Sequence, residues 1–258
     1  FRREREDMKN FSSKKTTPKQ KYKGFVVYEG PSMLDNAPIV VVATMKTSNR
    51  KTGDMVQTWI LRSDVNPIEA SKQKLDSSIC GNCPQRWSNG GACYVNIGQA
   101  PNAVYKSYKR GLYPKFNAGE HATHFAGRKV RLGAYGDPAA VPFNVLAGLV
   151  SYGIGHTGYT HQAQHKSFDK RYFGLVMVSA DTPKMALKMQ SLGAKTFRVA
   201  LEDDGMFENE NECFSESVGM TCEECMVCDG TKTNIAIKVH GSRKNKFTSN
   251  LIPVKLAA

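Results

Sequence analysis

The residues best suited to chemistry in this chain of 258 residues are seven cysteines, which fall into two groups. In the C-terminal group two residues separate each of the last three cysteines, and four thiolates so spaced can surround one zinc ion or hold an iron–sulfur cluster. Acidic neighbours disfavour thiolate formation, so we expect a metal to stabilise the thiolates, although reduced cysteines without metal remain the alternative. The group is Cys213, Cys222, Cys225 and Cys228.

The N-terminal cysteine group has only three members, which leaves one ligand position open. With zinc, that position would be taken by a water or by a histidine such as His121 or His124, and with a four-iron cluster one iron would be free to bind a cofactor. A fourth protein ligand would instead make a closed structural site. We expect Arg86 and the amides of Gly90 and Gly91 to donate hydrogen bonds to the sulfurs. The group is Cys80, Cys83 and Cys93.

The number and setting of the cysteines predict a cellular compartment. Seven cysteines cannot pair completely into disulfides, and clustered cysteines without a secretory signal favour metal binding in a reducing compartment. No apolar run reaches the length of a membrane span. The sequence therefore predicts a cytoplasmic protein that is not inserted into a membrane.

Charge is distributed unevenly along the chain. The net charge is +13, yet Val199–Thr231 holds ten acidic residues and no Lys or Arg. Phe1–Gly24 holds nine Lys and Arg against three acids, and the tail from Thr231 is basic as well. Basic ends on a folded middle indicate a polyanionic partner such as nucleic acid, or else simply solvated lysine-rich ends.

The hydrophobic pattern predicts an α/β fold. A hairpin of Ile39–Thr44 and Met55–Leu61 is followed by alternating helices and strands, which implies parallel strands in a partial or closed β/α barrel, although an open doubly wound sheet also fits. We expect a flexible basic arm at 1–24, one barrel-like domain at 25–241 and a basic tail at 242–258. The expected helices are Asn66–Lys74, Pro101–Arg110, Val141–Val150 and Thr182–Leu192; the further strands are Lys129–Ala134, Thr157–Thr160, Phe173–Ser179, Thr196–Leu201 and Asn234–Val239.

Polar side chains follow the predicted strands, where parallel sheets carry their ligand sites. We expect four of them to converge as catalytic residues, although the two carboxylates could instead cap helices and the two histidines could be hydrogen-bonded wall residues. Glycines beside them would let a ligand approach the backbone closely. The expected catalytic set is Asp137, His161, Asp181 and His240, and the expected cofactor-binding set is Gly133, Tyr135, Gly136 and Asp137.

The helix expected at Pro101–Arg110 is a candidate nucleic-acid contact. Its end carries Lys106, Lys109 and Arg110, which could contact phosphates. Tyrosines at 105, 108 and 113 lie between these basic residues and could stack on bases, or could pack in the core at helical spacing.

Several short motifs together resemble an uncharacterised bacteriophage-encoded protein family, for which no activity is established. The resemblance covers Gly53 to Gly241 and would place the protein in the cytoplasm of the host cell. The motifs are Asn82-Cys83-Pro84, Gly90-Gly91-Ala92-Cys93-Tyr94-Val95, Gly133-Ala134-Tyr135-Gly136-Asp137-Pro138, Thr157-Gly158-Tyr159-Thr160-His161-Gln162 and Thr221 through Cys228.

The order of these features is also distantly similar to radical S-adenosylmethionine enzymes, which have a partial β/α barrel, a three-cysteine loop, a following helix and often a second cluster. That family spaces its cysteines x3 then x2, whereas this chain has x2 then x9. The similarity implies a four-iron cluster at the first group, with S-adenosylmethionine at the rim Gly133–Asp137 and a nucleic-acid or nucleotide substrate. The alternative is a zinc-stabilised, non-catalytic protein that binds nucleic acid or serves phage assembly.

Overall fold

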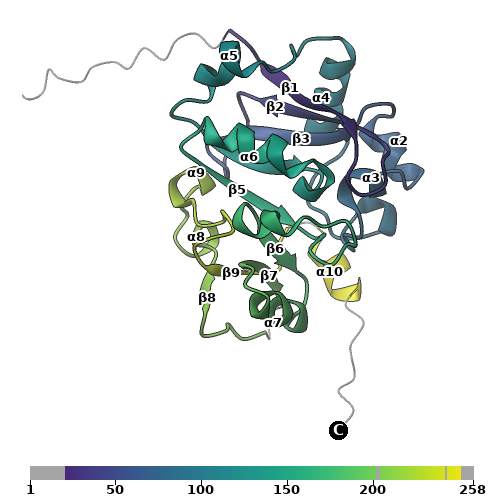
Figure 1. The fold of residues 1–258 in the computed structure, drawn as a ribbon. Helices are drawn as coiled ribbons and strands as arrows, with labels where there is room; N and C mark the ends of the chain where they lie inside the picture. Colours follow the sequence, from purple (N-terminus) through teal and green to yellow (C-terminus); the bar gives the residue numbers. More distant parts are fainter. Residues whose placement is uncertain (1–20, 202–203, 242, 251–258) are drawn as a thin grey trace, which may run out of the picture.

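The computed structural model describes residues 21–201, 204–241 and 243–250 (Figure 1). The strands among them form one nine-stranded sheet in the order β1-β2-β3-β4-β5-β6-β7-β9-β8. The predicted basic arm lies outside the described residues except for 21–24, and Gly24 already begins β1 (Gly24–Pro31).

The N-terminal third of the sheet is antiparallel. The predicted hairpin is confirmed as β2 (Pro38–Thr44) paired with β3 (Val56–Arg62), and β1 adds to the outer side of β2. Six of the seven residues of β2 are buried, which explains why the strand reads as an unbroken run of β-branched and small side chains.

The remaining strands pair in parallel, so the α/β class is confirmed. From β3 to β7 the strands follow the chain order without the reversal that defines a doubly wound sheet. The sheet is not closed into a barrel, because β1 and β8 stand at its two edges. The parallel strands are β4 (Lys129–Tyr135), β5 (Gly155–Thr160), β6 (Met177–Ala180), β7 (Thr196–Ala200), β8 (Glu210–Glu212) and β9 (Asn234–Lys238).

Four helices lie where the sequence predicts them: α2 (Pro67–Lys72), α4 (Ala100–Lys109), α6 (Phe143–Ser151) and α7 (Pro183–Ser191). Local signals explain this success. Asn66 caps α2, and Thr182 caps α7 by accepting a hydrogen bond from the amide of Met185. Short helices that the sequence did not indicate are α3 (Ser77–Cys80), α5 (Ala118–His121), α8 (Phe214–Ser217), α9 (Cys222–Cys225) and, within the predicted basic tail, α10 (Lys244–Asn250).

The strand predicted at Phe173–Ser179 is wrong in its first half. A 3-10 turn occupies Lys170–Gly174, and β6 begins only at Met177. Tyr172 fixes this turn, because its buried hydroxyl donates a hydrogen bond of 2.8 Å to the carbonyl of Val141. The run at 173–176 is therefore turn and loop rather than strand, and Leu175 and Val176 are its buried members.

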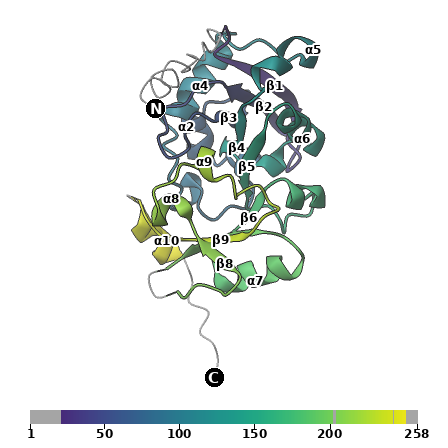
Figure 2. The same ribbon diagram turned by 90° about the vertical axis from the view of Figure 1, so that its left-hand side faces the viewer.

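The two faces of the sheet have different chemistry. On one face, Val130 and Leu132 pack in the main core, and α6 contributes the buried Leu146. The alternate residues of β4, including Arg131, project from the opposite face. α8 and α9 lie on the left of the molecule in Figure 1, on the side that faces the viewer in Figure 2.

Candidate functional site

A row of polar residues crosses four neighbouring strands. Thr44 of β2 pairs with Gln57 of β3, which pairs with Arg131 of β4, which pairs with Thr157 of β5. All four are buried, and strands within parallel sheets are normally apolar. We call these four residues the polar row, and a cavity lies near each end of it.

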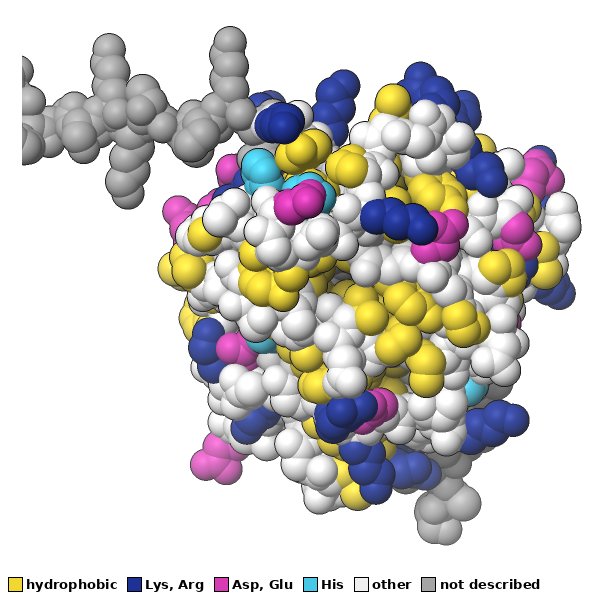
Figure 3. All heavy atoms as spheres, turned by 45° about the horizontal axis from the view of Figure 1, so that its top comes forward, with side chains coloured by type: hydrophobic (Ala, Val, Ile, Leu, Met, Phe, Trp, Pro, Cys, Tyr) yellow, Lys and Arg dark blue, Asp and Glu magenta, His cyan; other side chains and the backbone are white. Residues whose placement is uncertain are grey.

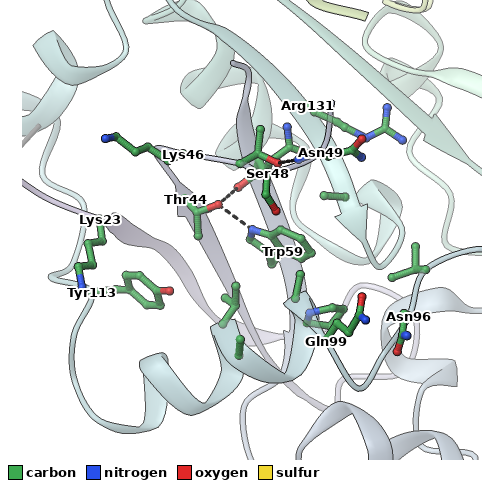
Figure 4. A pocket seen from close by; sticks show the side chains of 18 of the residues that line it. Lys23, Thr44, Lys46, Ser48, Asn49, Trp59, Asn96, Gln99, Tyr113 and Arg131 are labelled. Carbon is green, nitrogen blue, oxygen red and sulfur yellow. Dashed lines mark hydrogen bonds between the residues drawn. The ribbon is translucent and has the colours of Figure 1, made fainter. Parts of the chain in front are cut away.

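The larger cavity has a volume of about 730 Å³ and opens above Thr44, Gln57 and Arg131 (Figure 4). In Figure 4, Asn96 and Gln99 lie across from Lys46, with the ring of Trp59 between them. No Asp or Glu is among the described residues that line it, so we call it the acid-free cavity. Its lining holds three cations and four aromatic rings: Lys23, Lys46, Arg131, Tyr22, Trp59, Tyr94 and Tyr113.

Arg131 connects the acid-free cavity to the second cysteine group. Its Nη2 donates a hydrogen bond of 3.0 Å to the hydroxyl of Tyr94, and its guanidinium lies 5.2 Å from the ring centre of Tyr159. It is only 7% exposed and keeps its charge, because an arginine side chain is not deprotonated in proteins. A buried cation therefore stands between the two cavities.

The smaller cavity, of about 20 Å³, is lined by all four cysteines of the second group together with Thr157 and Tyr159. Three of these cysteines are held to other elements through their backbones. The amide of Cys213 donates to Ala236 at 2.9 Å and that of Cys222 to Lys51 at 2.9 Å, while the carbonyl of Cys228 accepts from Gly158 at 3.0 Å. Segments from β9, the β2–β3 turn and β5 thus bring the group together.

Burial has the largest effect on the pKa of two thiols of this group. It raises the pKa of Cys228 to about 12, and it also raises the pKa of Cys222. Arg131 and Lys51 act in the opposite direction at Cys222 and favour its thiolate. The acidic surroundings expected from the sequence are therefore offset at this thiol, because the fold places two cations from elsewhere in the chain beside it.

The first cysteine group lies beside the C-terminal end of β5. Gln162 holds its loop through two hydrogen bonds, from its Nε2 to the carbonyl of Cys80 at 2.9 Å and from the amide of Asn82 to its Oε1 at 3.0 Å. Burial raises the pKa of Cys80 and of Cys93, and the thiol of Cys83 close to both raises each further.

The histidine beside this group is His161, not His121 or His124. His161 hydrogen-bonds to Cys83, and its Nε2 lies 3.5 Å from Oδ2 of Asp181. Burial lowers the pKa of His161, but Cys83 and Asp181 outweigh burial and hold the pKa above its ordinary value. The two histidines named as possible ligands from the sequence, His121 and His124, pack instead against Tyr22 and Phe25.

Neither cysteine group is arranged as a finished metal site. Across 21–201, 204–241 and 243–250, no three His, Cys, Asp or Glu side chains are positioned to hold a metal ion. The amides expected to donate to the sulfurs of the first group are engaged elsewhere, and so is Nη1 of Arg86, although the buried Nε of Arg86 has no hydrogen-bond partner. Arg86 pairs with Asp76 at 3.1 Å, and the amides of Gly90 and Gly91 donate to the carbonyls of Trp87 and Arg86 within a turn.

Three of the four expected catalytic residues come together, and their contacts are structural. Asp137 is 7% exposed and accepts hydrogen bonds from the hydroxyl of Thr160 and the amide of His161, both at 2.7 Å. His161 in turn contacts Asp181. His240 lies elsewhere: it is exposed, 3.8 Å from Glu216 of α8, and belongs to no common site with the others.

The glycine rim expected to bind a cofactor is filled by the protein itself. A Cβ at Gly133 would lie 2.6 Å from the carbonyl oxygen of Gly136, and one at Gly136 would lie 2.7 Å from Ile60. Tyr135 is 5% exposed and packs in the main core. These residues allow close packing rather than the approach of a ligand, so the geometry does not favour the expected set Gly133, Tyr135, Gly136 and Asp137.

The basic residues expected to contact phosphates lie at the C-terminal end of α4. Lys106, Lys109 and Arg110 are exposed, but Tyr105 is buried and Tyr108 donates a hydrogen bond of 2.5 Å to Glu29. Tyr105 is therefore unavailable for stacking, whereas the ring of Tyr108 is only half-buried. On the face shown in Figure 3, Lys and Arg side chains are spread among separate hydrophobic groups rather than gathered in one patch.

Comparisons with known proteins identify no relative. No protein-family model matches the chain, and no curated protein or solved structure is similar to it. Among the helices that the structure describes, none has the length and apolar character needed to span a membrane. The acid-free cavity is the feature that sequence reasoning missed, because its lining comes from segments far apart in the chain.

Proposed function

We propose that the protein binds single-stranded nucleic acid or nucleotides in the acid-free cavity, and that its cysteine groups hold metal ions that stabilise the fold. The observation that carries the proposal is a lining with three cations, four aromatic rings and no carboxylate among its described residues. Cations attract phosphates, while aromatic rings stack on bases of any sequence.

The size and polar lining of the cavity suit such a ligand. Ligand cavities measure about 300–1,000 Å³, and 730 Å³ lies within that range. The side-chain amides of Asn49, Gln57, Asn96 and Gln99 also line it, and such groups can hydrogen-bond to base edges. The net charge of +13 would speed the approach of a polyanion.

Replacing Lys23 and Lys46 with glutamine should weaken binding to a labelled single-stranded oligonucleotide. Both lysines are exposed and line the cavity, and each phosphate contact contributes about −0.7 to the slope of log affinity against log salt. Fluorescence anisotropy at several salt concentrations would measure the slope, which should become shallower by about 1.4 in the double variant. The matched control replaces Lys184 and Lys188 on α7; an equal change there would contradict the proposal.

Replacing Tyr94 with alanine should weaken the same complex by about 5- to 100-fold, because stacking of a base on an aromatic ring contributes about 1–3 kcal/mol. Tyr94 is 75% exposed at the mouth of the cavity. Tyr94→Phe is the matched control, since it keeps the ring and removes only the hydroxyl that accepts from Arg131. If both variants bind like the parent protein, Tyr94 does not stack on bases.

A radical-type iron–sulfur enzyme is the second candidate. The observation in its favour is the place of the three-cysteine loop, which follows β3 and contacts Gln162 at the end of β5. His161 beside Cys83 and the filled glycine rim favour a closed site instead. Anaerobic purification with elemental analysis separates the two candidates, since iron with acid-labile sulfide would support the enzyme and zinc alone would exclude it.

A further inference from the structure

A buried threonine hydroxyl lies beside the four thiols of the second cysteine group. Oγ1 of Thr157 is buried and has no hydrogen-bond partner, although Thr157 is only 1% exposed and lines the cavity that the cysteines share. Burying a hydroxyl without a hydrogen-bond partner is unfavourable, so its place beside four sulfurs points to an acceptor formed only when a ligand is bound.

The walls of this cavity are fixed independently of any ligand. Cys222 and Cys225 stand at the two ends of α9, which a reciprocal capping box between Thr221 and Glu224 stabilises. The amide of Asp54 donates to Glu223 at 2.7 Å, which ties the same helix to the β2–β3 turn. Together with the backbone bonds of Cys213, Cys222 and Cys228, these contacts fix the backbone beside the cavity that the four cysteines line.

The cavity is matched to one ion rather than to a cluster. A volume of about 20 Å³ accommodates about one water-sized sphere, which suits a single ion better than a four-iron cube. Four thiolates around a single ion are the donor set of structural zinc, with Zn–S distances of about 2.3 Å. The cations Arg131 and Lys51 stand near Cys222, where they would offset the negative charge of such a site.

We propose that Cys213, Cys222, Cys225 and Cys228 bind a single zinc-class ion, and that Thr157 donates a hydrogen bond to one of its thiolates. The four cysteines already line the cavity, and binding requires their sulfur atoms to turn toward its centre. The thiol protons pass to solvent as the ion binds. The inference rests on the part of the proposed function that assigns metal ions to the cysteine groups, and it holds whether or not the acid-free cavity binds nucleic acid.

The test uses the whole chain and measures metal directly. Cys213→Ser should reduce zinc content by one ion per chain relative to the parent protein, while Cys93→Ser, in the first group, should leave this ion in place. Cobalt loading should give the intense visible bands of tetrahedral thiolate coordination in the parent protein and in Cys93→Ser. Iron with acid-labile sulfide at this group, or unchanged metal content in Cys213→Ser, would overturn the proposal.

Thr157→Val tests the hydroxyl without removing a ligand, so it remains informative if Cys213→Ser fails to fold. Loss of an outer hydrogen-bond donor should weaken zinc affinity by about 10- to 100-fold, measured by competition with a chromophoric chelator. The metal-free variant should be as stable as the parent protein, because no hydrogen bond is lost there. Thr123→Val, at an exposed position, is the matched control, and equal affinity in the two variants would remove Thr157 from the site.

Discussion

Replacing Arg198 with methionine should lower the free energy of unfolding by about 3–5 kcal/mol, the range expected when one partner of a buried ion pair is removed. Arg198 and Glu210 both have completely buried side chains, and Nη2 of Arg198 lies 2.6 Å from Oε2 of Glu210. The same guanidinium lies 4.5 Å from the ring centre of Phe207 and donates to the carbonyl of Gly205. Without it, Glu210 would be an unpaired charge in the interior. Urea denaturation of both proteins measures the difference.

Two controls make this result specific to burial. Arg171→Met removes an ion pair of similar length with Asp169, 2.6 Å, in which the arginine is exposed, and should destabilise the protein much less than Arg198→Met. The double variant Arg198→Met with Glu210→Leu should recover part of the loss, because the fully buried carboxylate is gone and Asp204, the other acidic partner of Arg198, is partly exposed. If Arg171→Met were as destabilising as Arg198→Met, burial would not be the cause.

The second large effect is expected at Asp137. Asp137→Ala should lower the free energy of unfolding by about 3 kcal/mol, because it leaves the hydroxyl of Thr160 and the amides of Ala139 and His161 without their acceptor, and each buried unsatisfied group costs about 1–3 kcal/mol. Thermal unfolding followed by circular dichroism measures the loss.

Oligonucleotide binding distinguishes this structural role from a role in a ligand site. Well below its melting temperature, Asp137→Ala should bind the oligonucleotide as the parent protein does, because Asp137 is not among the residues that line the acid-free cavity. Asp54→Ala, whose side chain is 70% exposed, serves as the control for removing a carboxylate and should be close to neutral in stability. Lost binding without lost stability would restore Asp137 as a functional residue.

The elements that sequence reasoning placed correctly are those with complete local signals. Thr182 followed by Pro183 begins α7, and the turn between β2 and β3 separates two runs of β-branched residues. The prediction of a strand at Phe173–Ser179 was wrong in its first half because an apolar run is equally compatible with a buried loop. The hydrogen bond from Tyr172 to the distant Val141 decides between strand and loop. The local sequence pattern therefore identified the helices and strands, while packing against distant segments set some of their first and last residues.

By itself, the sequence determined the α/β class, the parallel pairing implied by alternating strands and helices, and the division of the cysteines into two groups, because these follow from local periodicity and spacing. Only the tertiary structure decided which side chains meet. The register of β2 to β5 aligns the four residues of the polar row. The same strand pairing places Arg131 near Cys222, which belongs to a segment whose own charged residues are acidic. The end of β5 brought His161, rather than His121, to Cys83. Contacts between residues so far apart depend on strand order and register, which spacing along a chain does not encode.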